Sequence, residues 1–90
     1  MMTESQILKA AIKTFGERPQ EEMAVEECSE LIQAISHKHR GREHNMVDEI
    51  ADVELMCDQL KIINDCHDQV AAIRKKKIER LFERIFDKCL

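Results

Sequence analysis

The chain has 90 residues, 43% of them hydrophobic but only three aromatic, and this composition favours packed helices over a β-sandwich or barrel. We expect one domain, residues 1–90, with a thin core, because folding buries only about 60% of the surface of a chain this short. The net charge of -4 excludes a general binder of polymeric nucleic acid, and no apolar run approaches a membrane span, so neither partner is expected.

The first two predicted elements are helices with recognisable ends. Thr3 and Gln6 form a capping box, and apolar residues then recur at helical spacing as far as Gly16. A second helix should start with Pro19 at its first position and run to about His39, where cationic side chains and a glycine end it.

Two further helices complete the chain. Asn45 can cap a third helix that runs to about Ile63, and Asp65 could cap a fourth with apolar residues from Val70 to Phe86. Short joints make the second and third helices an antiparallel pair. We therefore expect an all-α fold of four helices, a helix bundle completed by oligomerisation into a homodimer or tetramer.

The four cysteines indicate free thiols. No signal peptide precedes Cys28, Cys57, Cys66 and Cys89, and no CxxC pair suggests zinc. We therefore expect a cytoplasmic protein. Cys28 and Cys57 fall on apolar helix faces, where we expect them to be buried as small hydrophobic side chains.

Four carboxylates on the second and third helices form the candidate site. Glu27 and Glu30, like Glu49 and Asp52, are three residues apart, so the members of a pair lie about 60° apart and one helical turn along. Each pair flanks apolar residues and should point toward the partner helix. Hard cations take oxygen ligands, so these acids could hold one or two Mg²⁺ ions, with Mn²⁺ also possible. On spacing alone, solvated acids are the competing interpretation.

The arrangement sets two physical requirements. Without a cation, four like charges would repel one another across the helix interface and cost stability. If the turn occupies residues 40–44, the two pairs are offset along the helix pair by up to roughly 9 Å. Stagger, or an earlier end of the second helix, must absorb this offset.

The pattern EExxE followed by ExxD, in EECSELIQAI and DEIADVELMCDQL, resembles the signature of the MazG-like all-alpha NTP pyrophosphatases, in particular the short phage-encoded members. The resemblance extends from Gln20 to Arg84. It implies a four-helix MazG-like fold and a magnesium-dependent hydrolase. Such an enzyme cleaves an NTP or dNTP between the α and β phosphates and releases the monophosphate and pyrophosphate.

The resemblance also implies roles for individual residues. Glu27, Glu30, Glu49 and Asp52 would bind the metal, and Glu26 would be an accessory acid for a further metal or the attacking water. Glu26 lies about 100° from Glu27 around the helix and cannot face the same point directly, so a solvated side chain is its competing interpretation.

Three further residues are assigned to the substrate by resemblance. Lys77, in KIERL, and Arg80 would contact substrate phosphates, and Gln20 would lie near the nucleotide. The remaining basic residues from Arg74 to Lys76 are interpreted as a solvated helix face.

Two other classes of function stay open. A di-iron carboxylate bundle also places acids on facing helices, but it uses Glu-x-x-His pairs, whereas the partners here are Glu30 and Asp52. A non-catalytic helical oligomer that binds nucleotide or a protein partner is the other alternative.

Overall fold

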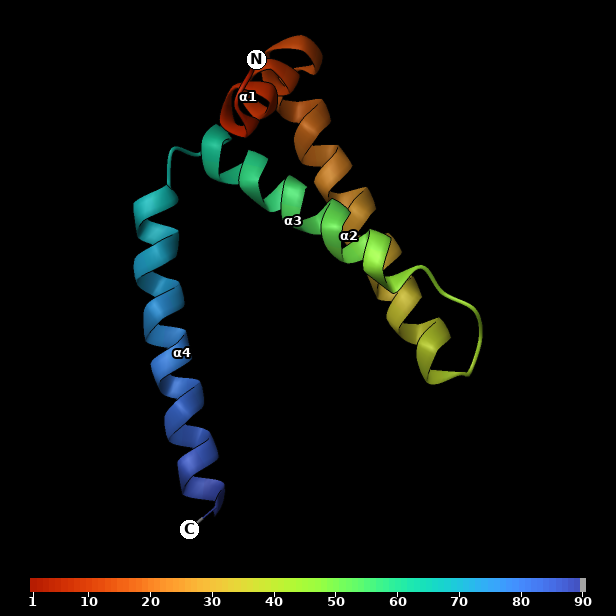
Figure 1. Ribbon diagram of the computed structural model, residues 1–90, viewed down its shortest axis with the longest axis vertical. Helices are drawn as coiled ribbons and strands as arrows, with labels where there is room; N and C mark the ends of the chain where they lie inside the picture. The colour runs from red at the N-terminus through yellow and green to blue at the C-terminus, as the bar shows by residue number, and fades with distance from the viewer. Residues whose placement is uncertain (90) are drawn as a thin grey trace.

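Four helices make up almost the whole chain in the computed structural model, which describes residues 1–89 (Figure 1). No strand occurs among these residues, so the all-α class and the number of helices are confirmed. In chain order the helices are α1 (Glu4–Phe15), α2 (Glu17–His39), α3 (Met46–Ile63) and α4 (His67–Cys89).

The start of α1 follows from its capping box. Thr3 Oγ1 accepts a hydrogen bond from the Gln6 backbone N–H at 3.1 Å, and Gln6 Oε1 accepts one from the Thr3 N–H at 2.9 Å. These two bonds satisfy backbone donors that have no partner inside the helix. The predicted capping box is confirmed.

A single glycine separates α1 from α2. The Gly16 N–H donates to the Ile12 carbonyl at 2.8 Å, and the Gly16 carbonyl accepts from the Gln20 N–H at 3.2 Å. Its φ of 98° lies in the region that only glycine adopts readily. Because Gly16 caps both helices, α2 begins at Glu17, so the prediction that Pro19 takes the first helical position is wrong.

The end of α3 also differs from the prediction. Asp65 has a φ of 48° and its N–H donates to the Ile62 carbonyl at 3.2 Å, while the Cys66 N–H donates to the Lys61 carbonyl at 3.1 Å. These two bonds form a Schellman motif, which ends a helix. Asp65 therefore terminates α3, and the prediction that it caps the fourth helix is wrong. The residue before α4 is Cys66.

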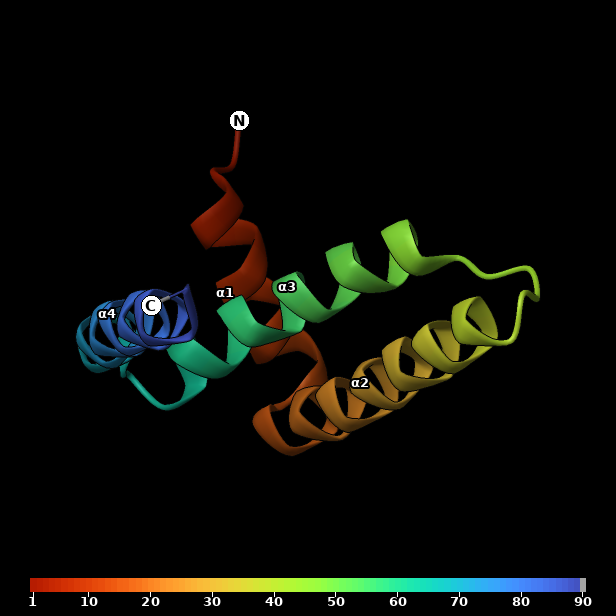
Figure 2. The same cartoon turned by 90° about the horizontal axis from the view of Figure 1, so that it is seen from below.

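The thin core lies between α2 and α3, which pack side by side as an antiparallel pair, the α2–α3 hairpin (Figure 2). Helix α1 contacts both of its members. Among the described residues, only Ala24, Ala34 and Met56 are buried hydrophobic side chains, accompanied by buried Gln20, Glu49 and Gln59.

Helix α4 stands apart from this core. Among the described helices it contacts only α3, and Figure 1 shows it leaving the end of α3 and running away from α2. Every residue from His67 to Lys88 is exposed. The radius of gyration is 16.5 Å, whereas a compact chain of this length has about 12 Å. One chain therefore does not close a four-helix bundle.

Two further sequence expectations concern the surface. Cys28, Cys57 and Cys66 are free thiols, but Cys28 and Cys57 are exposed. The expectation that these two are buried is therefore wrong within one chain. The side chain of Cys89 lies outside the described part of the chain. None of the described helices has both the length and the apolar character needed to cross a bilayer.

Candidate metal centre

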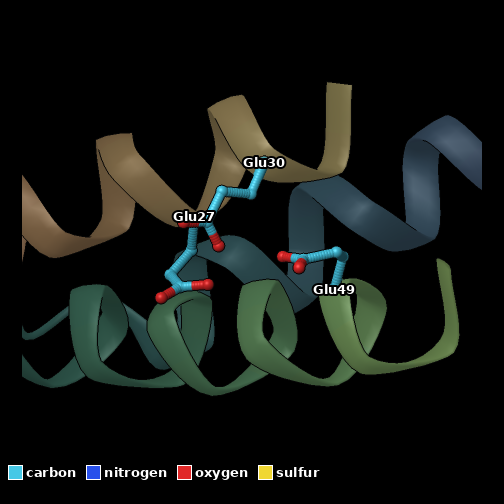
Figure 3. Close-up of side chains that lie close together, drawn as sticks. All are labelled: Glu27, Glu30 and Glu49. Carbon is cyan, nitrogen blue, oxygen red and sulfur yellow. The ribbon is translucent and has the colours of Figure 1, made fainter. Parts of the chain in front are cut away.

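Three glutamates from two helices converge between α2 and α3. Glu27 and Glu30 come from α2 and Glu49 from α3, and their side chains point into the space between the helices (Figure 3). One carboxylate oxygen from each residue lies within 4.8 Å of the other two. Glu49 is buried and the other two are half-buried. We call these three residues the acid cluster.

The fourth predicted acid lies beside this cluster. Asp52 is half-buried on α3, one turn after Glu49. It is close enough to Glu27 for its charge to raise the pKa of that carboxyl. The structure therefore brings all four predicted acids together, with three in the tight cluster and Asp52 next to it.

Burial and mutual repulsion perturb two of these carboxyl groups. Burial, followed by the charges of Glu30, Asp52 and Glu49, raises the pKa of Glu27 from 4.5 to about 7. Burial and then the charge of Glu30 also raise the pKa of Glu49. Within residues 1–88, no lysine or arginine forms an ion pair with any of these acids.

Two buried oxygens in the cluster have no hydrogen-bond partner. These are Oε2 of Glu27 and Oε2 of Glu49. Buried acceptors are normally paired, and an unpaired buried carboxylate is costly. A cation between the helices would satisfy both atoms and remove the repulsion. Since the donor atoms are all carboxylate oxygens, the residues fit a hard divalent cation such as Mg²⁺ or Mn²⁺.

Asn45 positions one of these carboxylates. It stands at the residue before α3 as predicted, yet its side chain makes no capping hydrogen bond. Its Nδ2 instead donates to Glu49 Oε1 at 2.8 Å, which leaves Glu49 Oε2 free for the cluster. This hydrogen bond also opposes the rise in the pKa of Glu49. Sequence reasoning missed this role, although a spacing of four residues places both side chains on one helix face.

A cavity of about 320 Å³ opens beside the acids. Sequence reasoning did not assign Gln33 and His37, although both lie on the stripe of Glu30, three and seven residues further along α2. Because α2 runs to His39 as predicted and Glu30 still meets Glu49, stagger of the two helices absorbs the predicted offset. The cavity is lined by Glu30, Gln33, Ala34, His37, Asn45 and Glu49.

The remaining predicted site residues lie away from the cluster within one chain. Glu26 is exposed. Gln20 is buried seven residues before Glu27, about 10 Å along the axis of α2. Lys77 and Arg80 line an exposed groove on α4, which makes no contact with α2 among the described residues.

Comparisons with known proteins add no relative from which roles could be transferred. No family model, no curated protein and no solved structure matches the chain. The interpretation of the site therefore depends on its own geometry, on its chemistry and on the motif.

Proposed function

We propose that this protein is a magnesium-dependent nucleoside triphosphate pyrophosphohydrolase that converts an NTP or dNTP into the monophosphate and pyrophosphate. The observation that carries the proposal is the pair of buried carboxylate oxygens without donors, inside a cluster contributed by two helices. This feature supports a divalent cation. The reaction class is supported by the resemblance of the EExxE and ExxD motifs to the MazG-like pyrophosphatases.

In this proposal the acid cluster and Asp52 hold Mg²⁺, or Mn²⁺ in its place. When bound, the cation neutralises charge on the triphosphate and promotes attack by water on phosphorus. Asn45 keeps Glu49 oriented through its 2.8 Å hydrogen bond. The side chains of Gln33 and His37 offer hydrogen-bond donors to an anionic ligand in the adjoining cavity.

The remaining assignments come from the resemblance. Glu26 would act as an accessory acid, Gln20 would lie near the nucleotide, and Lys77 with Arg80 would contact phosphates. Because α4 does not contact α2 within the described chain, the last two could act only in a homo-oligomer. A cytoplasmic location is likewise part of the proposal.

Product analysis tests the reaction directly. The protein is incubated with a panel of NTPs and dNTPs in Mg²⁺, and pyrophosphate and orthophosphate are measured separately. We expect pyrophosphate from at least one nucleotide, and a loss of at least about 100-fold for Glu49→Gln, since even outer-shell partners of a metal contribute roughly 10- to 100-fold. Glu54→Gln, an exposed acid on the same helix, is the matched control. Folded protein that releases no pyrophosphate from any nucleotide contradicts the proposal.

The alternative function is a non-catalytic helical oligomer that binds nucleotide or a protein partner. The exposed apolar side of α4 supports association with another molecule but gives no information about catalysis. Such a scaffold would gain no stability from Mg²⁺. A di-iron centre has less support, because the acid cluster contains no histidine.

A further inference from the structure

The single chain exposes more surface than a compact protein of its size. Its accessible surface is 7629 Å², whereas a folded monomer of 10.5 kDa has about 5,400 Å². The excess is about 2,200 Å² per chain. An obligate dimer buries about 1,000 to 2,500 Å² on each subunit, so the excess has the size of a dimer interface.

Part of this surface is an apolar groove on one side of the hairpin. We call Val25, Cys28 and Ile32 of α2, together with Leu60 of α3, the hairpin face, since they line a groove of about 570 Å³. Val25 is 72% exposed and Ile32 is 67% exposed. Around α2, Val25 and Ile32 lie about 140° to 160° from Glu27, so a molecule on the hairpin face would leave the acid cluster open.

The second apolar surface covers one side of α4. It lies beside basic residues, because Arg74 and Lys77 line the same groove of about 440 Å³ as four of its members. A lone amphipathic helix is marginally stable in water and gains stability by packing its apolar side on a partner. This surface, the α4 face, consists of Val70, Ile73, Ile78, Leu81, Phe82, Ile85 and Phe86, all of them exposed.

Net charge favours pairing of the α4 face with the hairpin face over pairing of either surface with its own copy. With histidines neutral, α2 and α3 together carry eleven acidic and three basic side chains, a net charge of -8. If the four acids of the candidate metal centre are left out of this sum, the net charge of the two helices is still -4. Helix α4 carries seven basic and four acidic side chains, a net charge of +3. Like charges would oppose pairing of hairpin with hairpin or of α4 with α4, whereas α4 and the hairpin attract each other.

We propose that two copies of this chain form a reciprocal dimer in which the α4 face of each copy packs on the hairpin face of the other. A dimer with twofold symmetry covers both apolar surfaces of both copies. It leaves neither surface free to bind a further copy. The reach of α4 away from its own hairpin makes the exchange possible (Figure 1). The proposal does not depend on the proposed function.

Sedimentation or light scattering of the full chain tests the dimer. We expect a mass of about 21 kDa, twice that of one chain. Ile32→Asp on the hairpin face and Leu81→Asp on the α4 face should each give a monomer, because each removes both contacts of a homodimer. Ala72→Asp, about 180° from Leu81 around α4, is the matched control and should remain dimeric.

Mixing the two variants distinguishes this dimer from other pairings. The intact α4 face of Ile32→Asp can pack on the intact hairpin face of Leu81→Asp. The mixture should therefore form a heterodimer in which one of the two α4-to-hairpin contacts is intact. The proposal is wrong if Ile32→Asp stays dimeric, as an α4-to-α4 dimer would, or if Leu81→Asp stays dimeric, as a hairpin-to-hairpin dimer would. Absence of the heterodimer also contradicts it.

Two measurements on the unaltered chain keep the proposal testable if the variants do not fold. The dissociation constant should rise with salt, because oppositely charged surfaces attract less when screened. A dissociation constant that falls with salt contradicts the assigned pairing. A monomeric chain at micromolar concentration, or a monomer that binds vesicles of anionic phospholipid through α4, overturns the dimer and assigns the α4 face to another partner.

Discussion

The α2–α3 hairpin and α4 carry opposite net charges and have very different environments. All three helices combine apolar residues with many charged ones, and α2 and α4 are both 23 residues long. The hairpin encloses Ala24, Ala34 and Met56 and brings acids from two helices together, whereas α4 buries nothing from His67 to Lys88. Burial therefore depends on the available partner and not on amphipathic character alone.

Truncation of a core side chain should reveal this contrast most strongly. Met56→Ala empties the largest buried apolar position of the hairpin and should cost about 2 to 5 kcal/mol. The neighbouring Leu55, which is 43% exposed, gives the matched control Leu55→Ala, with a smaller loss. Leu81→Ala on α4 should destabilise only at concentrations where the dimer forms. Denaturant unfolding at low and high protein concentration measures all three, and equal losses for Met56→Ala and Leu55→Ala would contradict the assigned core.

Magnesium should stabilise the hairpin through the acid cluster. At a free Mg²⁺ concentration about 100 times Kd, binding to the folded state alone contributes about 2.7 kcal/mol, which raises Tm by roughly 10 to 20 °C in a domain of this size. Thermal melts with Mg²⁺ and with EDTA measure the effect. Glu49→Gln should lose the shift and Glu54→Gln should keep it. An identical shift in both variants would place the cation elsewhere.

The hydrogen bond from Asn45 to Glu49 should affect metal affinity more than folding. Asn45→Ser keeps a residue that can cap α3 but removes the amide donor, so the metal affinity should fall by about 10-fold with little change in metal-free stability. Titration with Mn²⁺ and parallel melts separate the two quantities. A purely structural role would lower Tm and leave the affinity unchanged.

The metal-free protein should lose stability as the pH rises from 5 to 8, by a few degrees in Tm. The pKa of Glu27 is about 7 in the folded chain against an ordinary value of 4.5. Between these values the folded state holds a proton that the unfolded chain has released, so rising pH favours unfolding. Melts in EDTA at several pH values test this, and Glu27→Gln should show a flatter profile. A steeper decline in the variant than in the natural chain would contradict the assignment.

Local signals made much of the fold predictable. The capping box at Thr3 and the glycine after α2 depend on a few neighbouring residues, and both act at the expected helix ends. Gly16 and Asp65 could not be interpreted in the same way. Gly16 caps two helices at once, and Asp65 adopts a left-handed conformation more often taken by glycine, so each depends on how the joint folds.

The same distinction between local and longer-range signals applies to the candidate metal centre. The i, i+3 spacing of the acids is local, and the structure gathers all four predicted carboxylates. The turn of Asn45 toward Glu49 and the cavity beside His37 depend on the stagger of two helices, which sequence spacing does not determine. The position of Lys77 depends on α4, whose contacts within one chain do not bring it to the acids.

Direct measurement of metal binding tests the central claim most closely. Mn²⁺ is titrated into metal-free protein and followed by calorimetry or by its paramagnetic resonance signal, for the natural chain, Glu49→Gln and Glu54→Gln. The account predicts at least one bound ion per chain, an affinity at least about 10-fold weaker for Glu49→Gln, and no change for Glu54→Gln. Absence of binding to the natural chain, or equal binding by all three proteins, would contradict a metal centre at the acid cluster.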